Sequence, residues 1–303
     1  MASRPSRPLR GIRVLSLALN LPGPAALMRL HALGAKCVKL EPTPAKGAPS
    51  ADPMAIYSPQ AYTQLHAGVR VVHADLKTAA GQRRLHQLLQ GTDVLITSFR
   101  PSALTKLGLD WRSLHRAHPS LCHVVILGET GERGEIPGHD LTYLAAHGLV
   151  KGLDLPPTLY ADMAGSLAAC EAALALLWQR SQSPKGLGGR MEVGLSESAA
   201  HLSLPWHWGL TQASGPVGGA HAGYGVYACR DGRVAVAALE PHFAHRLCQV
   251  AGLVCTDAMA HLMSPKAPAQ LKRFFASQSR NHYSAKFCRR NALNVVLSCV
   301  VLI

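Results

Sequence analysis

Several features are scarce or missing in this 303-residue chain, and each absence excludes a class of protein. Aromatic residues make up only 5% of the sequence, so leucine, alanine and valine must supply most of the core. The eight cysteines form no Cys-x-x-Cys pair and no spacing typical of disulfide frameworks, which predicts reduced thiols in a cytoplasmic protein. There is neither a Gly-x-Gly-x-x-Gly fingerprint nor a Walker lysine, so the common nucleotide-binding loops are excluded.

Acidic residues are also few. Lysine and arginine number 31 against 17 aspartates and glutamates, which gives a formal net charge of +14 and predicts an anionic partner. The basic residues are scattered, and no helix-turn-helix, zinc-finger or RNA-recognition signature is present, so a phosphorylated small molecule is favoured over nucleic acid. No apolar run reaches the ~18 residues of a membrane span, and the N-terminus lacks an apolar signal core, so no membrane partner is expected.

Apolar strands alternate with helical segments over residues 9–127, as in the βαβ units of a parallel sheet. Further on, Arg230-Asp231-Gly232 separates two short apolar segments and indicates a β-hairpin. We therefore predict an α/β protein with an open, mostly parallel, Rossmann-like sheet in a large domain, residues 1–214, and a smaller α+β domain, residues 215–303. The expected elements are strands at 9–17, 37–41, 69–75, 93–97 and 119–127, a turn at Pro22-Gly23-Pro24, and helices at 25–33, 79–90, 162–180 and 197–212.

Asp162 is the leading candidate for chemistry. It stands at the head of an apolar helical stretch, where an acid can simply cap the helix N-terminus. His139 lies 23 residues upstream, in Gly138-His139-Asp140. A carboxylate and an imidazole brought together by a short connection can perform nucleophilic or proton-transfer chemistry. The alternative for His139 is a buried histidine that bonds backbone near Tyr143.

A metal site is not predicted. Histidine pairs three residues apart, such as His115 with His118 and His242 with His245, arise by chance in a chain with 16 histidines. No carboxylate near either pair completes a zinc ligand set.

Short motifs follow one another in a fixed order over residues 9–250. They are Leu9-Arg10-Gly11-Ile12-Arg13-Val14, Pro22-Gly23-Pro24-Ala25, Lys39-Leu40-Glu41-Pro42, Asp75-Leu76-Lys77, Phe99-Arg100-Pro101, Gly138-His139-Asp140, Asp162, Tyr227 and Glu240-Pro241. Each is weak alone, but in this order the chain resembles the class III CoA-transferase family (CaiB/BaiF type), which includes the α-methylacyl-CoA racemases.

The resemblance implies coenzyme A thioesters as substrates and an interlocked homodimer. The implied reaction moves CoA between carboxylic acids, with Asp162 as the nucleophile and an aspartyl acyl/CoA intermediate. The glycine-rich stretch 215–223 resembles the lid of some transferases, or is a plain linker. The alternative is an α-methylacyl-CoA racemase, in which His139 and Asp162 exchange a proton at the α-carbon and Glu240 is a supporting acid. A third hypothesis is a truncated, inactive paralogue.

The same resemblance suggests CoA contacts. Arg100, beside Phe99, is expected to bind the phosphates, because a guanidinium makes charge-assisted bonds to phosphate oxygens. Lys39 and Arg70 are further candidates, although Arg70 also suits a solvated surface. The stretch from about residue 285 to 303 departs from the family, whose full-length members run further, so a C-terminally truncated fold is expected. The sequence does not identify the acyl donor or acceptor.

Overall fold

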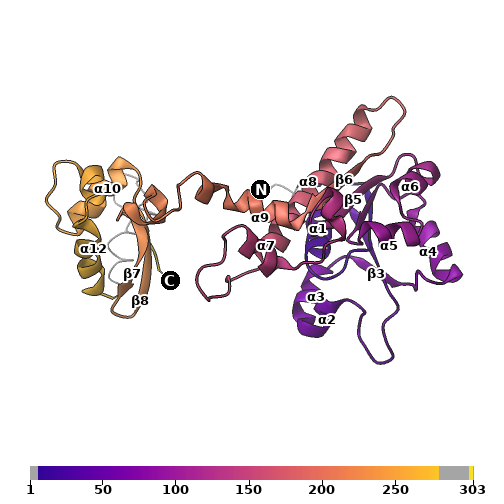
Figure 1. The fold of residues 1–303 in the computed structure, drawn as a ribbon, viewed down its shortest axis with the longest axis horizontal. Coiled ribbons are helices and arrows are strands. Elements are labelled where there is room, and N and C mark those ends of the chain that lie inside the picture. Colours follow the sequence, from indigo (N-terminus) through magenta and orange to yellow (C-terminus); the bar gives the residue numbers. More distant parts are fainter. Residues whose placement is uncertain (1–5, 280–299, 303) are drawn as a thin grey trace, which may run out of the picture. The chain divides into compact units, whose positions relative to one another are not determined.

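The computed structural model describes residues 6–279 and 300–302 (Figure 1). The chain divides into two compact units, Met1–Ser203 and Leu204–Ile303, and the division falls inside helix α9 (Leu195–His207). The sequence predicts the boundary eleven residues later, at 214. None of the six cysteines in the described ranges forms a disulfide.

The first unit is built on a six-stranded parallel sheet in the order β3-β2-β1-β4-β5-β6. The predicted open, parallel α/β fold is therefore confirmed. The strand order reverses between β1 and β4, and in such sheets ligands bind outside the carboxyl ends of the strands at this point. The strands are β1 (Arg13–Ser16), β2 (Lys36–Glu41), β3 (Arg70–His73), β4 (Val94–Thr97), β5 (Cys122–Leu127) and β6 (Arg190–Gly194).

Helices cover both faces of this sheet because side chains alternate along its buried strands. Val14, Ile96 and Val124 pack against α1 and α8 on one face. Leu15 and Leu95 pack against α4, α5 and α6 on the other. The helices of this unit are α1 (Pro22–Ala32), α2 (Pro53–Tyr57), α3 (Pro59–Leu65), α4 (Ala79–Leu89), α5 (Pro101–Lys106), α6 (Trp111–Ala117), α7 (Asp140–Ala146), α8 (Tyr160–Gln182) and the short 3₁₀ turn η1 (Gly131–Glu135).

Two helix boundaries differ from the sequence prediction. The expected turn at Pro22–Pro24 is the first turn of α1, because a proline at the start of a helix has the right φ and gives up only an N–H that would lack a partner. Helix α9 begins at Leu195 and ends at His207 instead of continuing to residue 212, and Pro205 lies in its last turn.

Helix α8 runs through the core of the first unit. Its buried positions are mostly small residues, including Ala161, Gly165 and Ala169, which let it lie close to α1, β5 and β6. By length and composition alone α8 is apolar enough to cross a membrane, but half of its most apolar 18-residue segment is buried inside this unit. Core helices of globular proteins share both properties.

The second unit contains the predicted hairpin. β7 (Tyr224–Cys229) and β8 (Gly232–Ala237) are antiparallel, and β9 (Val300–Leu302) extends the sheet beside β8. Three helices, α10 (Pro241–Val250), α11 (Ala258–Leu262) and α12 (Ala267–Ala276), share a core with this sheet. The glycine-rich stretch includes a π-helical turn, η2 (Pro216–Ala220). Apart from β9, the segment predicted to be atypical from about residue 285 lies outside the described residues.

Candidate active site

A cavity of about 250 Å³ opens at the carboxyl edge of the parallel sheet, at the point where the strand order reverses. The segments after β1, β4 and β5 and the first turn of α8 form its walls. This is the location that the fold favours for a ligand. The polar and charged side chains that line it are Asn20, Ser98, Arg100, His139, Tyr143 and Asp162.

Asp162 lies in the first turn of α8 with 8% of its surface exposed. It is not the cap of this helix, because α8 begins at Tyr160 and its N-cap is Leu159. The buried Asp140 of α7 performs the capping instead: its Oδ1 accepts the backbone N–H of Asp162 at 2.9 Å. The Asp162 carboxylate is therefore available to the cavity, and the simple capping interpretation no longer explains this residue.

The protonation of Asp162 is shifted by its surroundings. Burial, reinforced by the nearby Asp140 carboxylate and opposed by His139, raises the pKa of Asp162 to about 6. A carboxyl group with a pKa near 6 exchanges protons readily close to neutral pH. A buried acid that faces both another acid and an imidazole is typical of a catalytic centre rather than of a structural ion pair.

His139 immediately precedes α7 and is held by its backbone. Its N–H donates to Thr142 Oγ1 at 3.1 Å, and the Thr142 hydroxyl donates to the His139 carbonyl at 2.7 Å. The residue is exposed and lines the cavity, and it forms a capping box with Thr142 at the start of α7. The predicted alternative was a buried histidine, whereas His139 is exposed.

Tyr143 completes this wall of the cavity. A Cβ atom on either Gly128 or Gly138 would collide with the Tyr143 ring, so both glycines make room for it. Burial, followed by the charge of Asp162, raises the pKa of Tyr143, which keeps its hydroxyl protonated. The Gly138-His139-Asp140 motif thus supplies three things at once: space for a tyrosine, an imidazole and a helix cap.

Arg100 lines the same cavity. It lies in the loop after β4, exposed at the start of α5. Asp162, His139 and Arg100 therefore line one cavity. Phe99 is half-buried and packs into the core between the sheet and α4–α6 instead of lining the cavity. Glu240 precedes α10 in the second unit, so its role at this site stays a prediction.

Lys39 and Arg70, predicted to contact CoA, do not line this cavity. Lys39 is fully buried in β2, where its Nζ lies 2.9 Å from Glu41 Oε1 and is also paired with Asp52. Arg70 begins β3, at the opposite, amino edge of the parallel strands. Arg70 does not reach the cavity because the amino and carboxyl ends of the parallel strands lie at opposite edges of the sheet. Lys39 does not reach it because its side chain is buried and paired within the fold.

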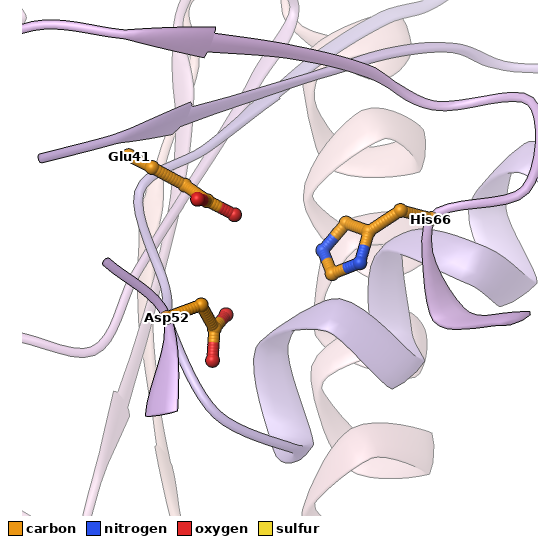
Figure 2. A group of neighbouring side chains, drawn as sticks. All are labelled: Glu41, Asp52 and His66. Carbon is orange, nitrogen blue, oxygen red and sulfur yellow. The ribbon is translucent and has the colours of Figure 1, made fainter. Parts of the chain in front are cut away.

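Figure 2 shows three neighbouring side chains, Glu41, Asp52 and His66. Their potential ligand atoms lie within 4.8 Å of one another, as in a metal site. The Lys39 ammonium, however, already lies between them, because His66 Nε2 is 2.9 Å from Lys39 Nζ in addition to the two carboxylate contacts. The chain supplies its own cation at this position.

Asp140 and Asn20 are the site residues that sequence reasoning missed. The sequence could have identified Asp140, because it is an acid in the first turn of a helix directly after a candidate catalytic histidine. Asn20 carries no such signal, because its role depends on a backbone φ of +69°, the only positive φ of a non-glycine residue in the described ranges.

An acid and a histidine therefore line one cavity at the switch point of the parallel sheet. Comparison with known proteins identifies the family. The chain belongs to CoA-transferase family III, whose model matches residues 9–299. The relatives with named activities are enzymes of two kinds, racemases and CoA-transferases.

Individual relatives are only modestly similar. The alpha-methylacyl-CoA racemase of Homo sapiens is 28% identical over 299 residues, which cover 93% of this chain and 74% of the relative. The succinyl-CoA–D-citramalate CoA-transferase of Chloroflexus aurantiacus is 33% identical over 215 residues, which cover 66% of this chain and 52% of the relative. A CaiB/BaiF family protein from Brucella suis shares the fold, with a TM-score of 0.73 and 23% identity over 93% of this chain and 81% of its own.

Proposed function

We propose that this protein inverts the α-carbon of a 2-methylacyl-CoA by proton transfer through His139 and Asp162. The observation that carries the proposal is that an imidazole and a buried carboxyl group with a pKa of about 6 line one cavity. A two-base inversion requires two side chains that can transfer a proton, one on each face of the α-carbon. The similarity to alpha-methylacyl-CoA racemases over 93% of the chain supports the same reaction.

The proposed reaction conserves every atom of the substrate. One of the two side chains removes the α-proton from one face, and the C–H electron pair moves into the thioester carbonyl to form an enolate. The other side chain then delivers a proton to the opposite face. The carbon emerges inverted, and His139 and Asp162 have exchanged their protonation states. Glu240 is kept in this proposal as a supporting acid.

CoA transfer through an aspartyl acyl/CoA intermediate is the second candidate, favoured by the relatives that are named as transferases. From sequence alone it is the leading hypothesis. Asp162 can act as a nucleophile as well as a base. Nothing in that reaction calls for His139 in the cavity, and the glycine-rich lid candidate, 215–223, belongs to the second unit. For these reasons we place racemisation first.

A labelling experiment separates the two reactions. One epimer of a 2-methylacyl-CoA is incubated with the wild-type protein in deuterated water, without any acceptor acid. We expect α-deuterium, detected by mass spectrometry, and both epimers on chiral chromatography. A second incubation contains a carboxylic acid as acceptor. If the α-carbon stays unlabelled in the first incubation while CoA passes to the acid in the second, and hydroxylamine then traps a hydroxamate on Asp162, the protein is a transferase. Absence of both reactions supports an inactive paralogue.

Arg100 is proposed to bind the CoA phosphates at the mouth of the cavity. Replacing it by alanine should weaken CoA binding in calorimetry by about 1.5–3 kcal/mol, the usual contribution of hydrogen bonds to charged groups. Arg84→Ala is the matched control, because Arg84 is also exposed but lines the amino edge of the sheet. Equal affinity losses in both variants would mean that Arg100 acts only through the overall positive charge.

A homodimer is retained as part of the proposal. A groove of about 890 Å³ runs between α8 and the start of α9, and apolar side chains such as Leu167 and Leu202 line it while 40% or more exposed. Exposed apolar surface of this kind is typical of protein interfaces. Sedimentation equilibrium of the purified protein tests the oligomeric state.

A further inference from the structure

The buried lysine of β2 has a complete set of partners. Lys39 Nζ is 2.9 Å from Glu41 Oε1, 2.9 Å from His66 Nε2 and bonded to Asp52 Oδ2. His66 Nδ1 lies 2.6 Å from the Tyr62 carbonyl, so the proton is on Nδ1 and Nε2 accepts from the ammonium. Burial, followed by the Lys39 charge, lowers the pKa of His66 and keeps it neutral. All three ammonium donors are therefore satisfied without solvent.

Asp52 connects this ammonium to two backbone segments. Its Oδ2 faces Lys39, while its Oδ1 accepts the N–H of Asn20 at 3.0 Å and the N–H of Met54 at 2.9 Å. The second bond caps helix α2, whose last residue is Tyr57. The side chain is completely buried, so a carboxylate that lost its cation here would be costly. Lys39 and Asp52 thus depend on each other.

The segment held by Asp52 belongs to the candidate active site. Leu19 and Asn20 connect the end of β1 to the start of α1, and both line the catalytic cavity. Asn20 adopts the left-handed backbone conformation, which non-glycine residues enter only at an energetic cost. Burial, followed by the charges of Asp52 and Asp162, raises the pKa of Tyr57 at the end of helix α2.

We propose that Lys39 and Asp52 are positioning residues for the catalytic cavity. The buried ammonium fixes the Asp52 carboxylate, and the carboxylate holds the Leu19–Asn20 turn in the conformation that lines the cavity. Lys39 thus serves CoA binding from behind the cavity wall and touches no phosphate. The statement about CoA rests on the proposed function, whereas the statement about the turn does not.

Two alanine variants separate positioning from general stability. Asp52→Ala and Glu41→Ala each remove one buried carboxylate beside Lys39, but only Asp52 is bonded to the Asn20 amide. Both variants should lower the melting temperature. Hydrogen exchange of the Asn20 amide should accelerate at least ~10-fold in Asp52→Ala and stay within ~2-fold of wild type in Glu41→Ala. Equal acceleration in both variants, or none in Asp52→Ala, would overturn the proposal.

Calorimetry with CoA itself provides the functional measurement. Asp52→Ala should bind CoA about tenfold more weakly than wild type, and Glu41→Ala should bind within about twofold. If wild-type protein does not bind CoA, the proposed function fails while amide exchange still decides the positioning role. If Asp52→Ala does not fold, hydrogen exchange of the wild-type protein tests the proposal instead. The Asn20 amide should then be as protected as the Met54 amide. Exchange of the Asn20 amide at the rate of an unstructured peptide would refute the proposal.

Discussion

Replacing Asp162 by asparagine should slow α-proton exchange by about 10²- to 10⁴-fold in the epimer whose α-proton faces Asp162, the usual contribution of a positioned acid–base group. An amide has nearly the size of a carboxyl group but neither takes nor returns a proton at neutral pH. Deuterium incorporation into a 2-methylacyl-CoA measures the effect. Glu171→Gln is the matched control, because it removes one acid from an exposed position of the same helix, outside the cavity. A fully active Asp162→Asn variant would place the chemistry on another residue.

The same substitution should stabilise the protein above pH 6. Burial raises the pKa of Asp162 from 3.8 to about 6, so the folded protein holds this proton more tightly than the unfolded chain does. Stability therefore falls as the pH rises from about 4 to 6, by on the order of 3 kcal/mol, and stays reduced above that range. Asparagine has no such charge to bury. Thermal melts should show a gain for Asp162→Asn at pH 7.5 that vanishes near pH 4.

Replacing His139 by glutamine should separate exchange from inversion. Interconversion of the two epimers should fall by about 10²- to 10⁴-fold, because one of the two faces loses its proton carrier. Asp162 can still exchange the α-proton on the face of the α-carbon nearest to it. One epimer should therefore continue to take up deuterium without inverting. Chiral chromatography combined with mass spectrometry of the recovered thioester measures both quantities.

His147→Gln is the control for this experiment. His147 lies at the other end of α7, where its Nε2 is 3.0 Å from Ser196 Oγ, and it does not line the cavity. Inversion should be unchanged in this variant. A His139→Gln protein that still inverts the α-carbon would remove His139 from the mechanism, and one that transfers CoA at the wild-type rate would favour the transferase.

The sequence by itself determined the sheet and singled out the leading candidates for catalysis. Alternating apolar strands and helices, such as 37–41 followed by 69–75, indicate parallel βαβ units, because a local hydrophobic period reports directly on which face of an element is buried. The pairing of Asp162 with His139 could also be inferred from the sequence, because both residues stand next to helix starts a short distance apart in the chain. These features depend on neighbours in sequence.

Only the tertiary structure decided what the charged residues do. Lys39 is buried because Asp52 and His66, 13 and 27 residues further along, fold around its ammonium. Asp162 is freed from capping because Asp140 performs it from another helix. The local pattern cannot distinguish a buried, paired charge from a solvated or phosphate-binding one, since the partners that stabilise a buried charge come from distant parts of the chain.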